Sequence, residues 1–472
     1  MVKTIRFYLN SRLVETNRPH GSILVDFIRG EQRHTGTKIG CREGECGACT
    51  VLLGKTRCAV FSYKAVASCL MALGQVNGAH VITIEGLNPP VGLNPIQQAF
   101  VDFGATQCGF CTPGFILSLT GFFCSSAELS LEDAFDSVDG NICRCTGYES
   151  IRKAIRFLLE TVGRDINTGK PRLQELMKAG ILPESFSGTE EKLNVLHPKS
   201  REEAEEEAVL VAGATDLLVQ NPEKLLRSKL RFLEPPEYAI REDKGRIVIA
   251  GTVTVSLLRQ DPVIGKYLTK IKEQSNRISS TLMRNRATIA GNIVNASPIG
   301  DLSVMFLALD GELSIRKGEA VRTKPLRKFF TGYKEYDLAG GEIIEEISIP
   351  VLESDARFAF DKVAMRRYLD IASCNAAVFL RYEGEAIHTA GIAAGGVAAY
   401  PLFLKQASAV LEGQPLSAEL LQEAVNTALS EIKPIDDIRG TAGYKRLLLR
   451  QILFGLFLEI FSDKISFEEL MR

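Results

Sequence analysis

The chain has 472 residues, which is too long for one hydrophobic core, so roughly two to four domains are expected. Its 45% hydrophobic and 24% charged residues are ordinary for a soluble globular protein, and a net charge of −1 gives no strong field for nucleic acid or an anionic membrane. The start, MVKTIRFYLN, lacks an apolar signal segment and no apolar run could span a bilayer, so we expect a cytoplasmic protein with no membrane or nucleic-acid partner.

Residues 1–90 are predicted to form a small mixed sheet with one helix and a cysteine-rich loop. Apolar residues alternate along the expected strands, and turn residues separate them. The loop, 36–50, holds too many glycines for regular structure. The expected strands are 3–9, 12–15, 50–54 and 79–87, and the expected helix is 22–30.

A helical pattern replaces the strands from Pro95 onward. Helical periodicity recurs through IQQAFVDFG, TPGFILSLTGFF, LEDAFDSV and SIRKAIRFLLETV, which predicts a helical domain over 91–163. Pro113 stands at the start of its helix, where a missing N–H costs little. Residues 164–191 lose this periodicity, so we expect a linker there.

The second half is predicted to contain two α+β domains, 192–355 and 356–472. A glutamate-rich helix is expected at 201–208, followed by strand-like VLVAGATDLLV and RIVIAGTVTV. From about residue 357, strand patterns give way to two long helical patterns, LSAELLQEAVNTALSEI and TAGYKRLLLRQILFGLFLEIF. Strands followed by helices favour an α+β fold.

Eight of the eleven cysteines form two sets of four. The first set has the spacing C-x4-C-x2-C with a later fourth cysteine, which is the plant-type ferredoxin pattern for a [2Fe–2S] cluster. Gly40, Gly44 and Gly47 supply the positive φ angles and close approach that such a loop needs. A structural zinc site is the alternative, since it also uses four thiolates. The members of the first set are Cys41, Cys46, Cys49 and Cys69.

The second set is less diagnostic, because C-x2-C followed by C-x-C also suits zinc. Its position beside a ferredoxin-like module favours a second [2Fe–2S] cluster. Its members are Cys108, Cys111, Cys143 and Cys145. The remaining cysteines, Cys58, Cys124 and Cys374, are expected to be small buried hydrophobic residues.

The two cysteine sets, with QCGFCTPG and NICRCTGY, resemble the iron–sulfur part of the molybdenum hydroxylases, the xanthine dehydrogenase/aldehyde oxidase family. VLVAGATDL, RNRATIAGNIVNASPIGDL and GGVAAYP resemble that family's flavin domain. The resemblance implies a multidomain α+β chain: a β-grasp ferredoxin domain, a four-helix [2Fe-2S] domain, a two-part α+β FAD-binding domain and a small α+β C-terminal domain.

The resemblance also implies a set of FAD contacts. Two small-residue turns would wrap the diphosphate and ribityl chain, and anions suit the N–H groups of such turns. No GxGxxG occurs, so a Rossmann site is not supported. The implied residues are Leu210, Val211, Ala212, Gly213, Ala214, Thr215, Asp216, Leu217, Thr288, Ile289, Ala290, Gly291, Asn292, Asn295, Asp301, Ile344 and Lys362.

Two details qualify this flavin site. Ala290 and Ala214 stand where the family commonly has glycine, or at 214 also asparagine, and alanine is tolerated if its φ is negative. RRYLDI, 366–371, resembles the stretch near the flavin ring, where positive charge would stabilise a reduced flavin; a solvated pair of arginines and a buried tyrosine is the alternative.

The resemblance implies an electron-transfer subunit, with no catalytic residue on this chain. The family's molybdopterin region does not follow residue 472, so we expect it on a large partner subunit, in a heterotetramer. Electrons would leave that centre through the second cluster, where Cys145 and Gln107 would face the pterin, and then pass through the first cluster and FAD to NAD+. An aldehyde or other heterocycle hydroxylase and a stand-alone iron–sulfur flavoprotein reductase remain alternatives.

Overall fold

The computed structural model describes residues 4–57, 60–164, 166, 171–196, 208–366, 368–384 and 386–470. The chain divides into two units. The first comprises Met1–Glu237 and Ser279–Ala287, and the second comprises Tyr238–Ile278 and Thr288–Arg472. The short segment 279–287 therefore belongs to the first unit, although the chain on both sides of it belongs to the second.

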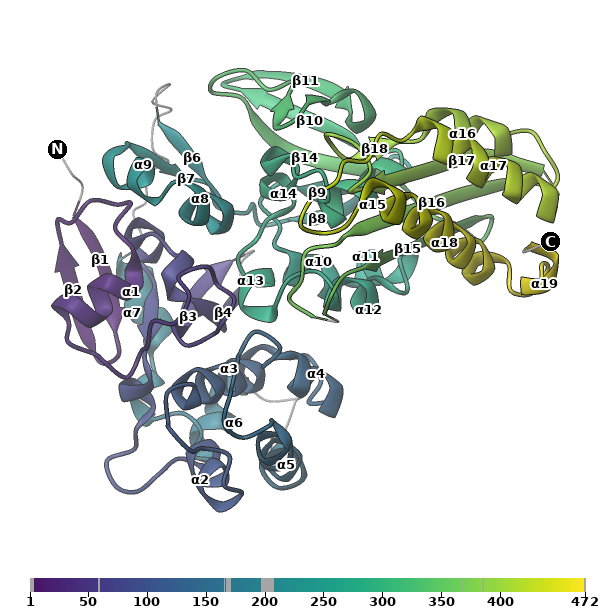
Figure 1. Ribbon diagram of the computed structural model, residues 1–472. Coiled ribbons are helices and arrows are strands. Elements are labelled where there is room, and N and C mark those ends of the chain that lie inside the picture. Colours follow the sequence, from purple (N-terminus) through teal and green to yellow (C-terminus); the bar gives the residue numbers. More distant parts are fainter. Residues whose placement is uncertain are drawn as a thin grey trace. The chain divides into compact units, whose positions relative to one another are not determined.

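The first unit opens with a mixed sheet in the strand order β2-β1-β5-β3-β4, with β1 and β5 parallel (Figure 1). In β1 the apolar residues Ile5, Phe7 and Leu9 alternate with polar ones and are buried, as a half-covered strand requires. The strands are β1 (Ile5–Leu9), β2 (Arg12–Thr16), β3 (Thr50–Arg57), β4 (Val60–Ala67) and β5 (His80–Ile82), and the short helix α1 spans Leu24–Asp26.

Helices follow the sheet within the first unit. The Asn94 side chain accepts from the Gln97 N–H and the Gln97 side chain accepts from the Asn94 N–H, so a capping box starts α2 at Pro95. Helix α3 is apolar on nearly all sides because it is the central element, packed against β3 and β4. The helices are α2 (Pro95–Asp102), α3 (Thr112–Ser125), α4 (Leu131–Asp136) and α5 (Glu149–Leu158).

The segment expected to be a linker, 164–191, contains regular structure. Helix α6 (Arg172–Lys178) lies inside it and α7 (Thr189–Leu196) begins in it. Phe186 is buried and its ring lies 5.0 Å from the Tyr63 ring, centroid to centroid. Apolar residues too widely spaced to show a period therefore still anchor this segment. Residues 201–207 of the predicted glutamate-rich helix lie outside the described residues.

Three further pieces complete the first unit. Strands β6 (Val209–Val211) and β7 (Leu230–Phe232) pair in parallel around α8 (Thr215–Gln220) and α9 (Pro222–Arg227). The segment 279–287 carries α13 (Thr281–Arg284). Arg284 is fully buried and its guanidinium donates to the equally buried Asp139 carboxylate at 2.6 Å.

The second unit contains an antiparallel sheet in the order β11-β10-β14-β9-β8. Its strands are β8 (Ile240–Asp243), β9 (Arg246–Ala250), β10 (Glu312–Lys317), β11 (Ala320–Pro325) and β14 (Ile343–Pro350). The helices of this part are α10 (Val255–Gln260), α11 (Pro262–Tyr267), α12 (Ile271–Asn276), α14 (Ile289–Asn295) and α15 (Asp301–Ala308). A small hairpin joins β12 (Phe330–Gly332) to β13 (Glu335–Tyr336).

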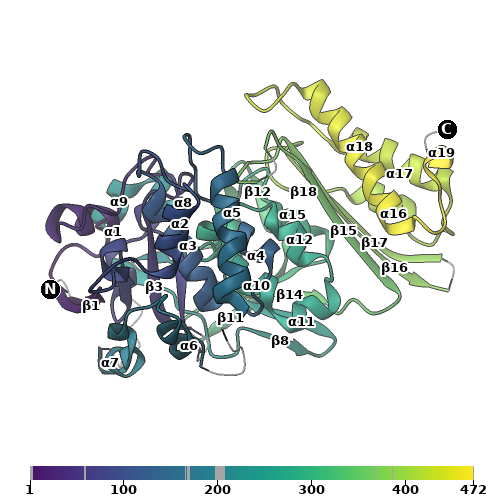
Figure 2. The same cartoon turned by 90° about the horizontal axis from the view of Figure 1, so that it is seen from below.

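A second antiparallel sheet, β15-β16-β17-β18, ends the second unit. Val378 and Leu380 of β16 point to the face of the sheet that helices α16–α18 cover. The opposite face of the sheet packs on α15, so the sheet lies between helices (Figure 2). Successive side chains of β16 and β17 point to opposite faces of the sheet, and because helices cover both faces, nearly all of these side chains are apolar. The elements are β15 (Ala356–Val363), β16 (Cys374–Glu383), β17 (Ala386–Gly395), β18 (Leu402–Phe403), α16 (Lys405–Leu411), α17 (Ala418–Glu431), α18 (Ala442–Phe461) and α19 (Phe467–Leu470).

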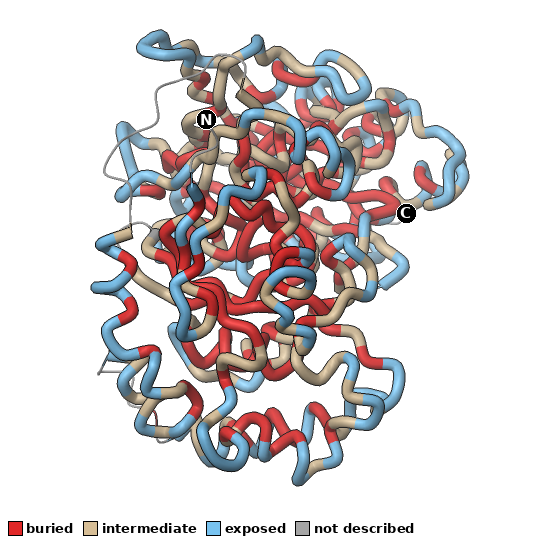
Figure 3. The backbone as a smooth tube through the Cα atoms, turned by 90° about the vertical axis from the view of Figure 1, so that its left-hand side faces the viewer, coloured by how far each residue is buried: buried red, intermediate tan, exposed pale blue. Residues whose placement is uncertain are grey.

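The predicted multidomain α+β fold class is confirmed. Buried residues follow the strands and inward helix faces, and exposed ones gather in the outer loops (Figure 3). Several elements differ from the sequence prediction; for example, strand β4 was not predicted, and the helix expected at 22–30 is a three-residue turn of α1 followed by a wider turn, Phe27–Glu31. Among the described residues, no helix is both long and apolar enough to cross a membrane.

Replacing Arg284 with leucine is expected to destabilise the first unit by about 3–5 kcal/mol, because the Asp139 carboxylate would stay buried without its counter-charge. Arg227→Leu is the matched control, since its partner Glu223 lies 3.8 Å away and both side chains are over 80% exposed. Such an exposed pair contributes about 0–1 kcal/mol. Denaturant unfolding measures both, and equal shifts in midpoint would contradict a buried role for Arg284.

Candidate redox centres

The first cysteine set lies where the 36–50 loop enters β3, with Cys69 following β4. Gly44 and Gly47 have φ of +76° and +65°, so the loop needs the conformational freedom of glycine there. Gly40 has no positive φ and serves close approach instead, since a Cβ at residue 40 would lie 2.9 Å from the Cys46 sulfur. The Glu43 N–H donates to the Cys41 sulfur at 3.3 Å, the kind of contact that stabilises a thiolate.

The second set lies at the start of α3 and before α5. The Thr146 hydroxyl contacts the Cys143 sulfur at 3.2 Å, and the backbone N–H of Cys145 donates to the same sulfur at 3.4 Å. The Tyr148 hydroxyl accepts from the Cys143 N–H. Cys108 and Cys145 are exposed, whereas Cys143 is buried, so this set has an outer and an inner side.

The eight thiols stand in pairs. Among the described residues, every cysteine is a free thiol, and no three histidine, cysteine, aspartate or glutamate side chains converge on one point to hold a single metal ion. Cys108 and Cys145 have sulfurs 3.7 Å apart. The other hydrogen-bonded pairs are Cys41 with Cys46, Cys49 with Cys69, and Cys111 with Cys143.

Pairing of this kind fits [2Fe–2S] clusters better than zinc. A structural zinc ion needs four sulfurs around one centre. A [2Fe–2S] cluster carries four thiolates on two irons, so each iron takes two. The donor set therefore fits two clusters, held by four pairs of thiols.

Hydrogen bonds prepare one sulfur of each first-set pair as a thiolate, the form that binds metal. The Cys46 thiol donates to Cys41 and lowers the Cys41 pKa to about 5, while the pKa of Cys46 is raised. The bond from Cys69 lowers the Cys49 pKa in the same way. In the second set, burial opposes ionisation of Cys143, but hydrogen bonds from Thr146 outweigh it and lower the Cys143 pKa.

The predicted flavin stretch 210–217 lies in the first unit, from β6 into α8. A Cβ at Gly213 would lie 2.3 Å from the Arg286 carbonyl oxygen, so no side chain fits there. Arg286 donates to the Gly213 carbonyl, and Gln75 to the Ala212 carbonyl at 2.8 Å. Ala214 has φ of +67°, so the expectation that alanine is tolerated by a negative φ is wrong at this position. A left-handed alanine costs about 1–2 kcal/mol.

The other predicted stretch, 288–292, starts α14 in the second unit. The Thr288 hydroxyl accepts from the Gly291 N–H at 3.1 Å and caps the helix. Ala290 lies inside that helix without a positive φ, as expected. The Gly251 turn brings Ile344 close to this stretch, because a Cβ at 251 would lie 2.3 Å from the Ile344 carbonyl oxygen and 2.9 Å from the Ala290 Cβ.

Asp301 and Lys362, distant in sequence, form a buried ion pair in the second unit. The Lys362 ammonium donates to the Asp301 carboxylate at 2.8 Å and to the Asp370 carbonyl at 3.1 Å. Asn375 donates to the other Asp301 oxygen at 2.6 Å, and its own Oδ1 has no hydrogen-bond partner among the described residues. Asn375 is fully buried. The sequence did not predict it as a site residue, because the strand around it is otherwise apolar, as expected for a core strand.

Two other predicted features lie nearby in the chain. Lys334 donates to the Asn295 side chain at 2.9 Å. The stretch 366–371 folds back toward Lys362. The Arg366 N–H donates to the Asp370 side chain, and the Asp370 backbone carbonyl accepts from the Lys362 ammonium. Arg367 lies outside the described residues. The roles of these residues toward FAD stay predictions.

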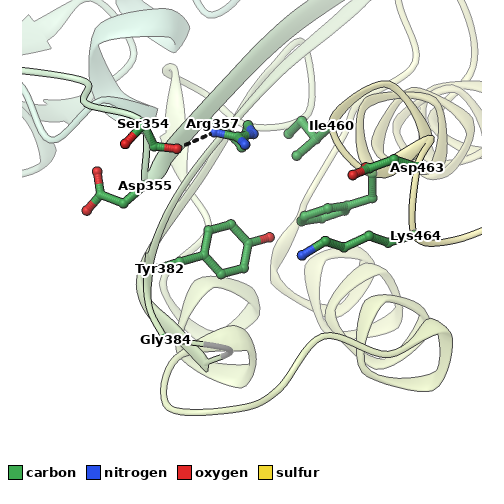
Figure 4. A pocket seen from close by; sticks show the side chains of 9 residues that line it. Ser354, Asp355, Arg357, Tyr382, Gly384, Ile460, Asp463 and Lys464 are labelled. Atoms are coloured by element: carbon green, nitrogen blue, oxygen red, sulfur yellow. Dashed lines mark hydrogen bonds between the residues drawn. The ribbon is translucent and has the colours of Figure 1, made fainter.

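The second unit also contains a cavity of about 300 Å³ that no predicted residue lines (Figure 4). Tyr382 and Lys464 face each other across it, with the ammonium 5.7 Å from the ring centre. Asp355, Arg357 and Asp463 complete a wall of mixed charge. This balance favours no class of ligand, so we assign no site to it.

Four family models match the chain in succession. Their descriptions are a 2Fe-2S iron-sulfur cluster binding domain (residues 7–71), a [2Fe-2S] binding domain (83–156), an FAD binding domain in molybdopterin dehydrogenase (191–352) and a CO dehydrogenase flavoprotein C-terminal domain (359–460). The two cysteine sets fall inside the first two matches, and the predicted flavin stretches fall inside the third.

Full-length relatives and solved structures agree with these matches. Xanthine dehydrogenase 1 of Arabidopsis thaliana is 30% identical over 92% of this chain and 38% of its own, and xanthine dehydrogenase of Drosophila subobscura is 28% identical over 98% and 39%. The chain thus spans about two fifths of these relatives. Carbon monoxide dehydrogenase from Hydrogenophaga pseudoflava superposes with a TM-score of 0.50 and 26% identity, covering 55% of this chain and 91% of that chain.

Two [2Fe–2S] domains followed by an FAD domain define the class of protein: an iron–sulfur flavoprotein that transfers electrons. More narrowly, the chain belongs to the molybdenum hydroxylase family, and it is similar to the iron–sulfur and FAD region of the xanthine dehydrogenase relatives.

Replacing Cys145 with serine is expected to remove about half of the iron and sulfide, because one of two four-thiolate sites loses a ligand. The flavin should remain, since Cys145 is remote in sequence from every predicted flavin residue. Cys124→Ala is the control: this thiol is buried in α3 and belongs to neither set. The measurement is the content of iron, acid-labile sulfide and flavin in each variant. Loss of FAD with intact iron in Cys145→Ser would contradict the assignment of Cys145 as a cluster ligand.

Gly291→Asp is expected to lower the FAD content, because it places a negative charge in a stretch predicted to hold a diphosphate. Any Cβ at 291 would lie 2.8 Å from the Thr288 hydroxyl, so Gly291→Ala separates crowding from charge. Gly265→Asp adds the same charge on exposed helix α11, where nothing lies within 4 Å of its Cβ. Bound flavin, measured by absorbance after denaturation, should fall most for Gly291→Asp; equal content in all three variants would argue against this loop.

Proposed function

We propose that this chain is the electron-transfer subunit of a xanthine dehydrogenase. In this proposal, electrons pass from a molybdopterin centre on a large partner subunit, through the two clusters to FAD, and on to NAD+, within a heterotetramer. The observation that carries it is the set of four thiol pairs, two to each [2Fe–2S] domain, in one chain with an FAD domain. A single-cluster reductase would need only two pairs.

When bound, the clusters supply one-electron transfer, and FAD supplies the conversion between one-electron and two-electron steps. The chain's residues would position these groups. The outer pair, Cys108 and Cys145, is exposed, and Gln107 beside it donates to the Cys145 carbonyl at 3.2 Å. This exposed set supports an entry point for electrons from a partner.

In the second unit, the residues that would contact FAD are the predicted stretch 288–292 and the Asp301–Lys362 pair. The Lys362 charge is balanced by Asp301, so this pair offers a fixed polar surface rather than a free cation. Asn375 keeps the Asp301 carboxylate in one orientation. We include Asn375 among the residues that would shape the flavin site.

A second candidate is the equivalent subunit of a hydroxylase for an aldehyde or another heterocycle. The structural similarity of 55% of this chain to a carbon monoxide dehydrogenase chain supports this candidate, because that enzyme is named for a different substrate. Substrate choice would then lie with the partner subunit. A stand-alone iron–sulfur flavoprotein reductase is the third candidate, and it predicts no molybdenum in the isolated protein.

The natively isolated protein is expected to contain about four iron, four sulfide and one FAD per chain. Molybdenum should be found with a large associated chain, and the complex should reduce NAD+ with xanthine. The isolated chain should not oxidise xanthine, but should pass electrons from dithionite to its flavin. Iron and flavin without molybdenum would favour the reductase, and turnover with an aldehyde alone would favour the second candidate.

A further inference from the structure

The two cysteine sets meet at a direct backbone contact within the first unit. The Ile142 N–H donates to the Cys46 carbonyl at 3.1 Å. The neighbouring Asn141 side chain donates to the next carbonyl, that of Gly47, at 3.2 Å. Consecutive residues of one loop therefore bind consecutive peptide groups of the other.

There is no space for a side chain at this contact. A Cβ at Gly47 would lie 2.4 Å from the Asn141 side-chain nitrogen, and one at Gly114 would lie 2.3 Å from the Gly47 carbonyl oxygen. Contacts under 3 Å force atoms to move. The close approach therefore depends on Gly47 in the first loop and on Gly114 in helix α3.

Asn141 is held in place from its other end. Its side chain is buried, and its Oδ1 accepts from the Ser118 hydroxyl of α3 at 2.7 Å. This bond fixes which end of the amide is the donor, and the donor end faces Gly47. The same donor end also lies 3.4 Å from the Thr50 hydroxyl, so Asn141 has one orientation, determined by three partners.

The positions of these contacts in the chain are informative. Cys46 is a predicted ligand of the first cluster, and Ile142 is followed directly by Cys143, a predicted ligand of the second. The hydrogen bond between Ile142 and Cys46 thus links the two predicted ligands, Cys46 and Cys143, through only a few backbone bonds on each side. Cys143 also belongs to the inner, buried side of its set.

We propose that Asn141 is a positioning residue for electron transfer between the two clusters. Its hydrogen bond fixes the position of the Gly47 peptide. The Cys46 carbonyl therefore stays hydrogen-bonded to the Ile142 N–H, and this bond connects the two ligand sets. One electron leaves the reduced second cluster, which is oxidised, and reduces the oxidised first cluster; no proton moves and no covalent bond changes. This inference rests on the proposed electron-transfer function.

Asn141→Asp tests this role, because it keeps the shape and the acceptor for Ser118 but cannot donate to Gly47. Asn141→Ser is the second variant, since it removes the amide without adding charge. Thr120→Val is the matched control: the Thr120 hydroxyl is buried in α3 and donates to the Ile116 carbonyl at 2.8 Å, so the isosteric change removes a buried hydrogen bond that involves neither Asn141 nor Gly47. All three are assayed in the full chain with iron, sulfide and FAD content measured first.

The readout is the electron paramagnetic resonance spectrum after reduction with dithionite, when each [2Fe–2S] cluster carries one unpaired spin. Magnetic splitting between the two signals reports how closely the clusters are held. We expect the parent protein and Thr120→Val to keep this splitting, and the Asn141 variants to lose part of it while retaining both signals. Re-equilibration of electrons between the clusters after photoreduction should slow in the same variants.

The outcomes separate the two levels of inference. Two signals whose splitting and re-equilibration are unchanged in both Asn141 variants would overturn the role of Asn141. An equal loss in Thr120→Val would also overturn it, since the effect would then follow from removing any buried hydrogen bond of the helical domain. Asn141 variants that fail to load the second cluster at all would make the residue a structural one and refute the proposal. Only one cluster signal in the parent protein would instead refute the proposed two-cluster function.

Discussion

The approach of the two cysteine loops at Gly47 is the constraint on which the cluster half of the molecule depends. The loop that carries Cys46 cannot carry a side chain at residue 47, because the Asn141 amide and the Gly140 carbonyl occupy that space. Helix α3 must offer Gly114 at the same point for the same reason. The ferredoxin-like sheet and the helical domain, each of which carries four thiols, are joined here at the cysteine loops themselves, in addition to the packing of α3 on β3 and β4.

A second constraint joins the two halves of the sequence. Residues 279–287 interrupt the flavin part of the chain, yet they belong to the first unit. Arg284 is neutralised by Asp139, and Asn285 donates to the Ala65 carbonyl of β4 at 2.8 Å. Burying a charged pair gives little net stability, but it strongly disfavours any arrangement that separates the partners. The segment that leads into Thr288 is therefore fixed by the iron–sulfur half.

The flavin half relies on a buried polar network in an apolar sheet. Lys362 on β15, Asp301 on α15 and Asn375 on β16 meet although sequence separates them widely. Each is expensive to bury alone, and together they satisfy most of their hydrogen bonds. Two local features depart from this pattern of satisfied groups and unstrained backbone. The Asn375 Oδ1 has no hydrogen-bond partner in the described part of the chain, and Ala214 has a left-handed backbone; Asn375 contacts a predicted flavin residue, and Ala214 is one.

The sequence by itself determined the order of the domains and the α+β class, and it predicted the two sets of four thiol ligands. Ligand spacing is local, and so are the glycines that let a loop curl around a metal centre. Tertiary structure decided the division of the thiols into pairs, the outer and inner sides of the second set, and the meeting of Cys46 with Ile142. It also turned the expected linker into anchored helices and brought Asn375 to Asp301. These features depend on contacts between residues far apart in the chain, whose geometry no local pattern of side chains encodes.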